Sequence, residues 1–227
     1  MSTIELVVFD MAGTTINDDD GVNRCVRAAL EQVGVSATRD AVNVVMGIPK
    51  PMAIRQLLER YKRPELIEQL DAIHADFVGR MIEFYRTDPS VHEIAGAAQT
   101  FRRLRAAGIK TALDTGFSRD IVDVVLKRLG WKDDSLLNMT VTSDEVPRGR
   151  PHPDMIEKIM RDLGVGDPRH VAKVGDTPSD LEEGTAAHCG MIVGVTGGSH
   201  TAEQLRPFPH THLIGTVAEL PALLGVA

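Results

Sequence analysis

The stretch VVFDMAGTT, residues 7–15, decides the fold of this chain. Three apolar residues lead into Asp10, and the turn-forming sequence Gly13-Thr14-Thr15 follows. A short continuous apolar run is typical of a strand that is buried on both faces of a parallel sheet. An aspartate at the end of a strand is often only a turn residue, but ligands bind beyond the carboxyl ends of parallel strands. The stretch therefore predicts a buried strand that brings one carboxylate to the ligand-binding edge of a sheet.

Four further apolar runs lie downstream, and helical patterns separate them. The five predicted strands are ELVVF (5–9), IKTALD (109–114), NMTVTS (138–143), HVAKVG (170–175) and MIVGV (191–195). Strands that alternate with helices form a parallel sheet with crossover helices on both faces. We therefore predict an α/β fold with a doubly wound, Rossmann-like parallel sheet as its core.

One segment interrupts this alternation. Helical patterns without a strand fill the chain from about Val22 to Tyr85, between the polar segment INDDDG (16–21) and the turn-prone TDPS (87–90). In the last pattern, apolar residues recur at helical spacing: Leu66, Leu70, Ile73, Phe77 and Met81. We predict a catalytic core of residues 1–16 and 89–227, with an all-helical domain, residues 17–88, inserted as a hinged lid.

Composition limits the classes of function. The 227 residues carry a net charge of −7, and the basic residues are scattered, so nucleic acid is not an expected partner. No apolar run approaches the roughly 18 residues of a membrane helix, and the N-terminus does not resemble a signal peptide. The two cysteines, Cys25 and Cys189, fit no metal or redox spacing. These features predict a cytoplasmic protein without a membrane anchor.

Polar residues follow four of the predicted strands. Asp10 follows the first strand, Thr115 and Gly116 the second, Arg150 the third, and the segment Gly175–Asp180 the fourth. Alone, each is most simply a turn or helix-cap residue. Together, at one edge of a sheet, they are suited to phosphoryl transfer through a covalent intermediate on the first aspartate.

Two carboxylates in this set, Asp10 and Asp176, would repel each other unless a cation lay between them. Mg²⁺ suits such a position, because it binds one or two carboxylates together with phosphate oxygens and water. Thr115 and the backbone N–H groups near Gly116 can hold phosphate oxygens, and the guanidinium of Arg150 can bind phosphate while staying charged. The sequence thus predicts phosphoryl transfer with Mg²⁺ as cofactor.

The segments FDMAGTT, LDTGFS, RGRPHP and VGDTPSDLEEG resemble the four sequential motifs of the haloacid dehalogenase superfamily. Within it, the chain is similar to the phosphonatases, that is, phosphonoacetaldehyde hydrolase and phosphonatase-like hydrolases. This narrower resemblance rests on Ala12, on Arg150 in GRPHP and on Lys50 in MGIPK. It covers nearly the whole chain and implies that the helical insert is a type I cap domain.

The resemblance also implies roles for residues at matching positions. Asp10 would be the nucleophile and a metal ligand, the carbonyl of Ala12 a second ligand and Asp176 a third, with Asp180 as a supporting carboxylate. Thr115, Gly116 and Arg150 would bind the phosphoryl group, and Met46 would contact the substrate. A homodimer formed through the cap helices is possible by the same resemblance.

Ala12 stands where most phosphatases of the superfamily have a second aspartate, which protonates the leaving alcohol and activates water. Phosphonatases also have alanine there. They break a P–C bond, and a cap lysine that forms an imine with the substrate aldehyde accepts the electrons. Lys50 stands at that position and would need a pKa below its usual value of about 10.4 to attack a carbonyl as a neutral amine.

Three departures from the phosphonatase pattern bear on the substrate, one of them the charged run Asp18–Asp20, where the segment after the first motif is usually uncharged. Ala53 replaces a histidine that serves proton transfer, and Phe117 replaces a tyrosine. Three functions therefore stay open: hydrolysis of phosphonoacetaldehyde or a related phosphonate; Mg²⁺-dependent hydrolysis of a small phosphate ester such as phosphoglycolate or a sugar phosphate; and binding of a phosphorylated ligand without turnover.

Three other patterns are best explained structurally. Asp18–Asp20 is expected to be a solvated linker and helix cap. TGGSH (196–200) lacks the spacing of a phosphate-binding loop and is predicted to be a turn. His210 and His212 are too far from any motif to indicate a metal site.

Overall fold

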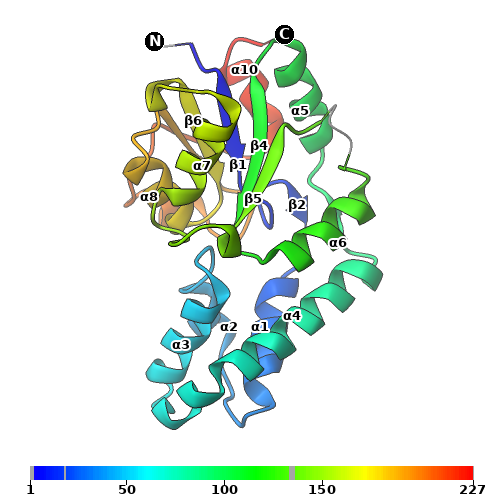
Figure 1. Ribbon diagram of the computed structural model, residues 1–227, viewed down its shortest axis with the longest axis vertical. Coiled ribbons are helices and arrows are strands. Elements are labelled where there is room, and N and C mark those ends of the chain that lie inside the picture. The colour runs from blue at the N-terminus through cyan, green and yellow to red at the C-terminus, as the bar shows by residue number, and fades with distance from the viewer. Residues whose placement is uncertain (1–2, 18, 133–135, 227) are drawn as a thin grey trace.

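The computed structural model describes residues 3–17, 19–132 and 136–226. Its centre is a six-stranded parallel sheet with the order β5-β4-β1-β6-β7-β8 (Figure 1). The strands are β1 (Leu6–Phe9), β4 (Lys110–Thr115), β5 (Met139–Thr142), β6 (Val171–Gly175), β7 (Met191–Val195) and β8 (His212–Ile214). The predicted doubly wound α/β core is confirmed, and each of the five predicted strands is present within a residue or two of its expected bounds.

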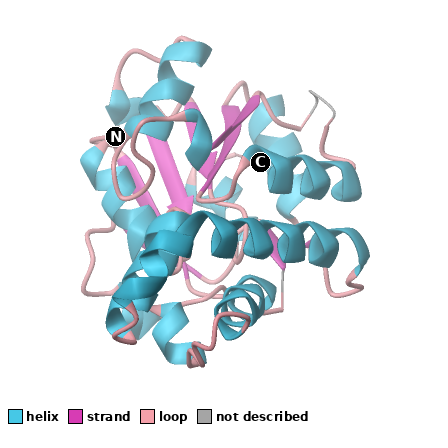
Figure 2. Cartoon of the chain, turned by 60° about the horizontal axis from the view of Figure 1, so that its bottom comes forward, coloured by secondary structure: helices cyan, strands magenta, loops and turns pink. Residues whose placement is uncertain are grey.

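Helices cover both faces of the sheet (Figures 1 and 2). They are α5 (Ala97–Ala106), α6 (Arg119–Leu129), α7 (Asp154–Leu163) and α8 (Pro178–Ala186), with the short α9 (Ala202–Leu205) and α10 (Leu220–Leu223). Alternate residues of β1 belong to different cores: Val7 and Phe9 lie in the cluster that includes α5 and α6, and Leu6 and Val8 in the cluster that includes α7. All four are fully buried, which explains the continuous apolar run in this strand.

The insert between β1 and α5 is helical, as expected, and lies beyond the carboxyl ends of the strands, at the bottom of Figure 1. It contains α1 (Gly21–Glu31), α2 (Arg39–Asn43), α3 (Lys50–Arg60), the 3₁₀ helix η1 (Pro64–Gln69) and α4 (Leu70–Thr87). Ile73, Phe77 and Met81 of the repeating pattern are buried in one face of α4. We call this insert the cap; its bounds, residues 17–88, stay a prediction.

The chain enters and leaves the cap through a small ribbon. Strands β2 (Ile16–Asn17) and β3 (His92–Glu93) pair antiparallel, Ile16 with Glu93 and Asn17 with His92. Neither strand was expected, because two residues are too few to show an alternating pattern. The ribbon therefore holds together the two places where the chain enters and leaves the cap, near the carboxyl end of β1.

Short 3₁₀ turns complete the fold: η2 (Ser143–Glu145), η3 (Pro168–His170) and η4 (Val217–Glu219). Edge strand β8 and the five-residue α2 are further elements that the sequence patterns did not predict. Among the described residues, no helix combines the length and the apolar character that a bilayer crossing requires.

Candidate active site

The strand order brings the predicted site residues together. Strand β1 lies between β4 and β6, so the residues that follow these three strands share one edge of the sheet. Asp10 (5% exposed), Thr115 (3%) and Asp176 (0%) are all buried there. The sequence-based expectation that these side chains share one crevice agrees with their positions.

The turn after β1 fixes the direction of Asp10. Its N–H donates to the carbonyl of Val174 in the neighbouring strand, at 2.9 Å. The carbonyl of Met11 accepts from the N–H groups of Thr14, Thr15 and Ile16, so the chain reverses within a few residues. The hydroxyl of Thr15 donates to the Asp10 carbonyl, at 2.9 Å. Hydrogen bonds to the neighbouring strand β6 and within the turn therefore fix the backbone that carries the Asp10 carboxyl group.

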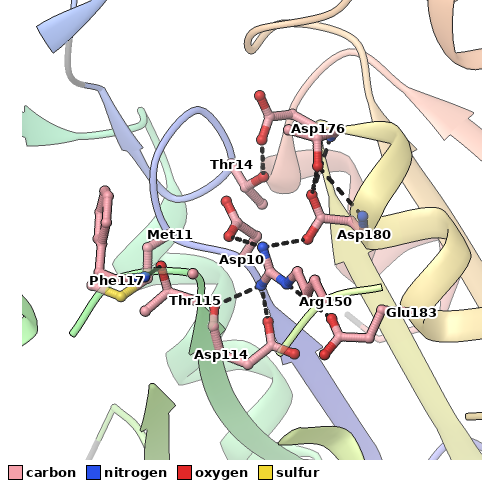
Figure 3. A network of polar contacts seen from close by, with 12 residues as sticks. Asp10, Met11, Thr14, Asp114, Thr115, Phe117, Arg150, Asp176, Asp180 and Glu183 are labelled. Atoms are coloured by element: carbon pink, nitrogen blue, oxygen red, sulfur yellow. Dashed lines mark hydrogen bonds and ion pairs between the residues drawn. The ribbon is translucent and has the colours of Figure 1, made fainter. Parts of the chain in front are cut away.

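Arg150 is the cationic centre of the site (Figure 3). Its side chain is 1% exposed, and its Nη1 lies 2.6 Å from Asp10 Oδ1 and 2.9 Å from Asp180 Oδ1. Its Nε lies 2.9 Å from Glu183 Oε2, and its Nη2 is paired with Asp114. One planar guanidinium therefore joins four carboxylates, a geometry that lysine could not provide.

A second buried cation supports the first. Lys173, on β6, is fully buried, and its ammonium pairs with Asp114, with Glu183 at 2.8 Å and with Asp180 at 3.3 Å. Lys173, Asp114 and Glu183 were not among the predicted site residues. A lysine inside an otherwise apolar strand was the available signal, because a buried charge needs buried partners.

Negative charge exceeds positive charge in this cluster, and the pKa values reflect it. Burial raises the pKa of Asp10 to about 6, although Arg150 opposes this shift. Burial also raises the pKa of Glu183 to about 8, and the nearby Asp114 carboxylate raises it further. At Asp114 the two cations outweigh burial, and its pKa falls below the usual value. The two cations, Arg150 and Lys173, therefore do not neutralise all of the carboxylates that surround them.

Asp176 is held by the loop that follows β7. The N–H of Ser199 donates to Asp176 Oδ2 at 2.6 Å, and the hydroxyl of Thr14 donates to Oδ1 at 2.9 Å. Burial raises the pKa of Asp176 to about 8, with a further contribution from Asp10. The segment TGGSH is thus a turn, as predicted, and it also orients a site carboxylate.

The carboxylates could hold a metal ion. Oxygen atoms of Asp10, Asp114 and Asp180 lie within 4.8 Å of one another, all three residues are buried, and hard oxygen ligands suit Mg²⁺. Burial and neighbouring carboxylates raise the pKa of both Asp10 and Asp176, which a divalent cation would relieve. This group shares Asp10 and Asp180 with the predicted ligand set. Asp114 was not predicted, and the roles assigned to Ala12 and Asp176 stay a prediction.

The cap contributes the opposite wall of the site. Lys50 begins α3, is 4% exposed, and its Nζ donates to the carbonyl of Ile48 at 3.2 Å and lies 5.8 Å from the centre of the Phe117 ring. Gly47 has φ +84°, and a Cβ there would lie 2.3 Å from the hydroxyl oxygen of Thr177. The loop that carries Lys50 is therefore seated directly on the core.

A small cavity of about 20 Å³ lies between these walls. Its lining includes all six predicted catalytic and substrate-binding residues, namely Asp10, Lys50, Met46, Thr115, Gly116 and Arg150, together with Ala12. We call it the reaction cavity. Its volume corresponds to one or two water-sized spheres, so the cap excludes most solvent from the Asp10 carboxylate.

Other predicted features fall outside the reaction cavity. Asp18 lies outside the described residues. Asp20 is the residue before α1, makes no side-chain capping hydrogen bond, and pairs with Arg39 at 3.0 Å. Ala53, at the position of the phosphonatase histidine, is a buried core residue of α3. Thus no proton-transfer group occupies that position.

The chain combines a parallel α/β sheet with a helical cap. A buried aspartate follows the first strand, and a carboxylate cluster beside it could hold a metal. These features define a hydrolase of the haloacid dehalogenase type. The family model for haloacid dehalogenase-like hydrolases matches residues 7–193. The chain belongs to this family.

Relatives with assigned names agree with this membership. The chain is 31% identical to phosphonoacetaldehyde hydrolase from Bacteroides fragilis, over 97% of this chain and 88% of that protein. It is 35% identical to phosphonoacetaldehyde hydrolase from Bacillus cereus, over 86% and 77%. A crystal structure of a phosphonoacetaldehyde hydrolase-like protein from Oleispira antarctica superposes with a TM-score of 0.86 at 23% identity, covering 99% of this chain and 92% of that one.

Proposed function

We propose that this hydrolase cleaves the P–C bond of phosphonoacetaldehyde or a related small phosphonate aldehyde. One observation carries the proposal: Lys50 of the cap and Asp10 of the core line the same small cavity, and Ala12, which lines it too, offers no acid. An amine and a carboxylate that face one substrate can divide the reaction between them. The amine binds the aldehyde, and the carboxylate attacks phosphorus.

In the first step, Lys50 condenses with the aldehyde, and one water leaves as the imine forms. An oxygen of Asp10 then attacks phosphorus, and the P–C bond breaks. The electron pair of that bond moves toward the iminium nitrogen, which leaves an enamine on Lys50 and a phosphoryl group on Asp10. Because the protonated imine accepts the electrons, no acid is needed at Ala12.

In the second step, water attacks the phosphoryl group, the bond to Asp10 breaks, and phosphate leaves. Protonation of the enamine carbon and addition of a second water release acetaldehyde and restore the Lys50 amine. The sum consumes one water for each phosphonoacetaldehyde. Thr115 and the N–H of Gly116 would hold phosphoryl oxygens, with the guanidinium of Arg150 beside them.

We also propose Mg²⁺ as the cofactor. Asp10, the Ala12 carbonyl, Asp176 and Asp180 would hold it, and when bound it offsets the charge of the carboxylates and of the phosphoryl group. Arg150 joins Asp10 to Asp180 at 2.6 and 2.9 Å, so these two carboxylates already converge on a single positive group. Our proposal further includes a core of residues 1–16 and 89–227, a cap of residues 17–88, and a homodimer formed through the cap.

The decisive experiment is borohydride trapping. Phosphonoacetaldehyde and borohydride should inactivate the enzyme irreversibly, and mass spectrometry should find the two-carbon adduct on Lys50. Lys50→Ala should release no phosphate from phosphonoacetaldehyde, and Asp10→Asn should be equally inactive. If Lys50→Ala retained full activity, the imine mechanism would be wrong.

A second function is favoured by one contact. The Lys50 ammonium donates to the carbonyl of Ile48, so it could serve as a fixed cation for a phosphate ester such as phosphoglycolate or a sugar phosphate. Phosphate release from such esters that borohydride does not affect would support this alternative. Binding without turnover is the third candidate; stabilisation by fluoroberyllate with no phosphate release from any of these compounds would support it.

A further inference from the structure

Lys173 shares its acid partners with Arg150. Its Nζ is paired with Asp114 Oδ1, with Glu183 Oε2 at 2.8 Å and with Asp180 Oδ1 at 3.3 Å. Arg150 is paired with the same three oxygen atoms: with Asp114 Oδ1 through Nη2, with Glu183 Oε2 through Nε at 2.9 Å and with Asp180 Oδ1 through Nη1 at 2.9 Å. We call Asp114, Asp180 and Glu183 the shared acids. Each of them is therefore paired with two buried cations.

Asp10 differs from the shared acids, because Lys173 is not paired with it. Arg150 Nη1 donates to Asp10 Oδ1 at 2.6 Å (Figure 3). In the part of the chain that the structure describes, this is the one ion pair of Arg150 that Lys173 does not duplicate. The other nitrogens of the guanidinium face the shared acids, and Nη2 also donates to the carbonyl of Asp114 at 2.9 Å. A phosphoryl group attached to Asp10 would therefore meet the N–H of Nη1.

The fold makes room for Lys173 inside the sheet. Its side chain is fully buried, and its neighbours in register are Val8 of β1 and Ile192 of β7. A Cβ at Gly184 of α8 would lie 2.9 Å from Lys173 Cβ and 3.1 Å from its Cγ, so α8 packs directly on the stem of the lysine. Lys173 is not among the described residues that line the reaction cavity, so it can act on the reaction only through other groups.

The charges indicate what the second cation does. A buried carboxylate is costly unless a cation and hydrogen bonds compensate it, and charges attract each other strongly where water is excluded. With Lys173 present, two cations compensate the shared acids. Without its charge, Arg150 would be the one cation paired with them among the described residues, and they would draw the guanidinium toward themselves. The contact of Nη1 with Asp10 would weaken as a result.

We propose that Lys173 is a positioning residue for phosphoryl transfer: it compensates the shared acids, so that Arg150 keeps one N–H directed at the phosphoryl group on Asp10. This inference rests on the proposed function in one respect, that Asp10 accepts the phosphoryl group. It is the same for a phosphonate and for a phosphate ester, because Lys173 touches neither.

Calorimetry with fluoroberyllate, which mimics a phosphoryl group on an aspartate, tests the role of Lys173. Lys173→Met removes the charge and keeps the apolar stem. Lys173→Gln also removes the charge but keeps a hydrogen-bond donor for the shared acids, and it serves as the second variant if the first does not fold. With Mg²⁺ present, both should bind fluoroberyllate at least about tenfold more weakly than wild-type protein, because a hydrogen bond from a charged donor is weakened.

Mg²⁺ binding without fluoroberyllate separates positioning from general damage. Loss of a cation beside Asp180 leaves the proposed metal site more negative, so both variants should bind Mg²⁺ at least as tightly as wild-type protein does. A merely structural defect would weaken the binding of both ligands. Lys110→Met is the matched control: this strand lysine begins β4, and its Nζ donates to the Leu163 carbonyl at 2.6 Å. It should bind both ligands as wild-type protein does.

Wild-type affinity for fluoroberyllate in the two neutral variants would overturn the proposal. Parallel losses of Mg²⁺ and fluoroberyllate affinity would overturn it too, and so would failure of both variants to fold, because Lys173 would then serve the fold alone. In each of these cases wild-type protein still binds fluoroberyllate, and the proposed function is untouched. If wild-type protein with Mg²⁺ does not bind fluoroberyllate, Asp10 is not a phosphoryl acceptor and both proposals fail.

Discussion

Arg150 shows how much of the site depends on one side chain. Four carboxylates surround its guanidinium: Asp10 and Asp180 share Nη1, Glu183 lies at Nε, and Asp114 at Nη2. These acids come from three segments, since Asp180 and Glu183 both lie on α8, and all four are buried. The guanidinium therefore joins the ends of β1 and β4 to helix α8, besides any contact that it makes with substrate.

Replacing Arg150 by methionine should destabilise the protein by about 3–5 kcal/mol, because the carboxylates that remain are buried without their main cation. Urea unfolding at pH 7 measures the change. Arg148→Met is the matched control: it lies two residues away, its side chain is 60% exposed, and its pair with Asp154 is at the surface. That variant should lose less than about 1 kcal/mol. A loss of the same size in both variants would contradict the role given to Arg150.

Gly198 limits the position of Asp176. A Cβ at residue 198 would lie 2.4 Å from Asp176 Oδ2 and 2.4 Å from the carbonyl of Gly13. Gly198→Ala should displace the carboxylate from the Ser199 N–H and weaken Mg²⁺ binding about tenfold or more, as loss of an outer hydrogen bond does in other metal sites. Mg²⁺ titration calorimetry measures this. Gly166→Ala is the control, because no atom lies within 4 Å of its Cβ position; unchanged Mg²⁺ affinity in Gly198→Ala would show that Asp176 does not bind the ion.

At the residue scale, the sequence located side chains that follow strands better than those inside them. Asp10, Thr115 and Asp176 could be found because each stands at the end of an apolar run. Lys173 and Glu183 could not be placed in the same way, because their partners come from distant segments and appear only once the strand order is known. A buried lysine in β6 implies acids around it, but sequence alone does not say which acids.

Among the elements, the loop between α2 and α3 connects chemistry to cap position. It carries Met46 into the reaction cavity and leads directly to Lys50, the first residue of α3, and Gly47 brings the loop backbone against Thr177. Position 47 contacts the core through its backbone and the small Thr177 hydroxyl. These groups can move little, so the site would not accommodate a residue larger than glycine. The seating of the cap on the core thus depends on this loop.

Gly47→Ala should therefore lower kcat/KM at least about tenfold, because the new Cβ would lie 2.3 Å from Thr177 Oγ1 and keep the cap from closing. Steady-state phosphate release measures the loss. Gly108→Ala separates closure from backbone strain: Gly108 has φ +80°, close to the +84° of Gly47, and no atom lies within 4 Å of its Cβ position. Both variants should lose about 1–2 kcal/mol of stability from the left-handed backbone. Equal kcat/KM values in the two variants would contradict the closure argument.

The elements that the sequence did not predict are the short ones. The two-residue strands of the ribbon and the three-residue β8 contain no full period of a strand pattern. Helix α2 has five residues and is begun by Thr38, whose hydroxyl accepts from the Ala41 N–H. The long helix α4 was predicted from its buried stripe, but its predicted first turns at Pro64–Gln69 form a separate 3₁₀ helix. Tertiary contacts, rather than local preference, define these short elements.

For the whole molecule, the buried carboxyl groups of the site predict how the free energy of unfolding depends on pH. The pKa values of Asp176 and Glu183 are about 8 and that of Asp10 about 6, against about 4 in an unfolded chain. The folded protein binds protons more tightly, so the unfolding free energy falls as pH rises from about 4 to about 8. Asp114, whose pKa is lowered, has the opposite effect, but only below about pH 4.

Metal-free protein should therefore lose a few kcal/mol, on an order-of-magnitude estimate, between pH 5 and pH 8. Mg²⁺ should raise Tm more at pH 8 than at pH 5, because protons compete for the carboxylates that bind it. Thermal unfolding at both pH values, with and without Mg²⁺, measures this. Calcium-free, magnesium-free buffer with chelator is the reference. A stability that rises with pH in the absence of metal would show that the buried acids are ionised and already compensated.

The ribbon formed by β2 and β3, through which the chain enters and leaves the cap, has a consequence for how the cap could be changed. The chain leaves the core and returns to it at the paired residues Ile16–Asn17 and His92–Glu93, whereas the sheet, the nucleophile and the carboxylate cluster all lie outside this inserted segment. Because this segment also carries Lys50, exchanging it would be expected to alter the chemistry proposed for the cap together with substrate selectivity.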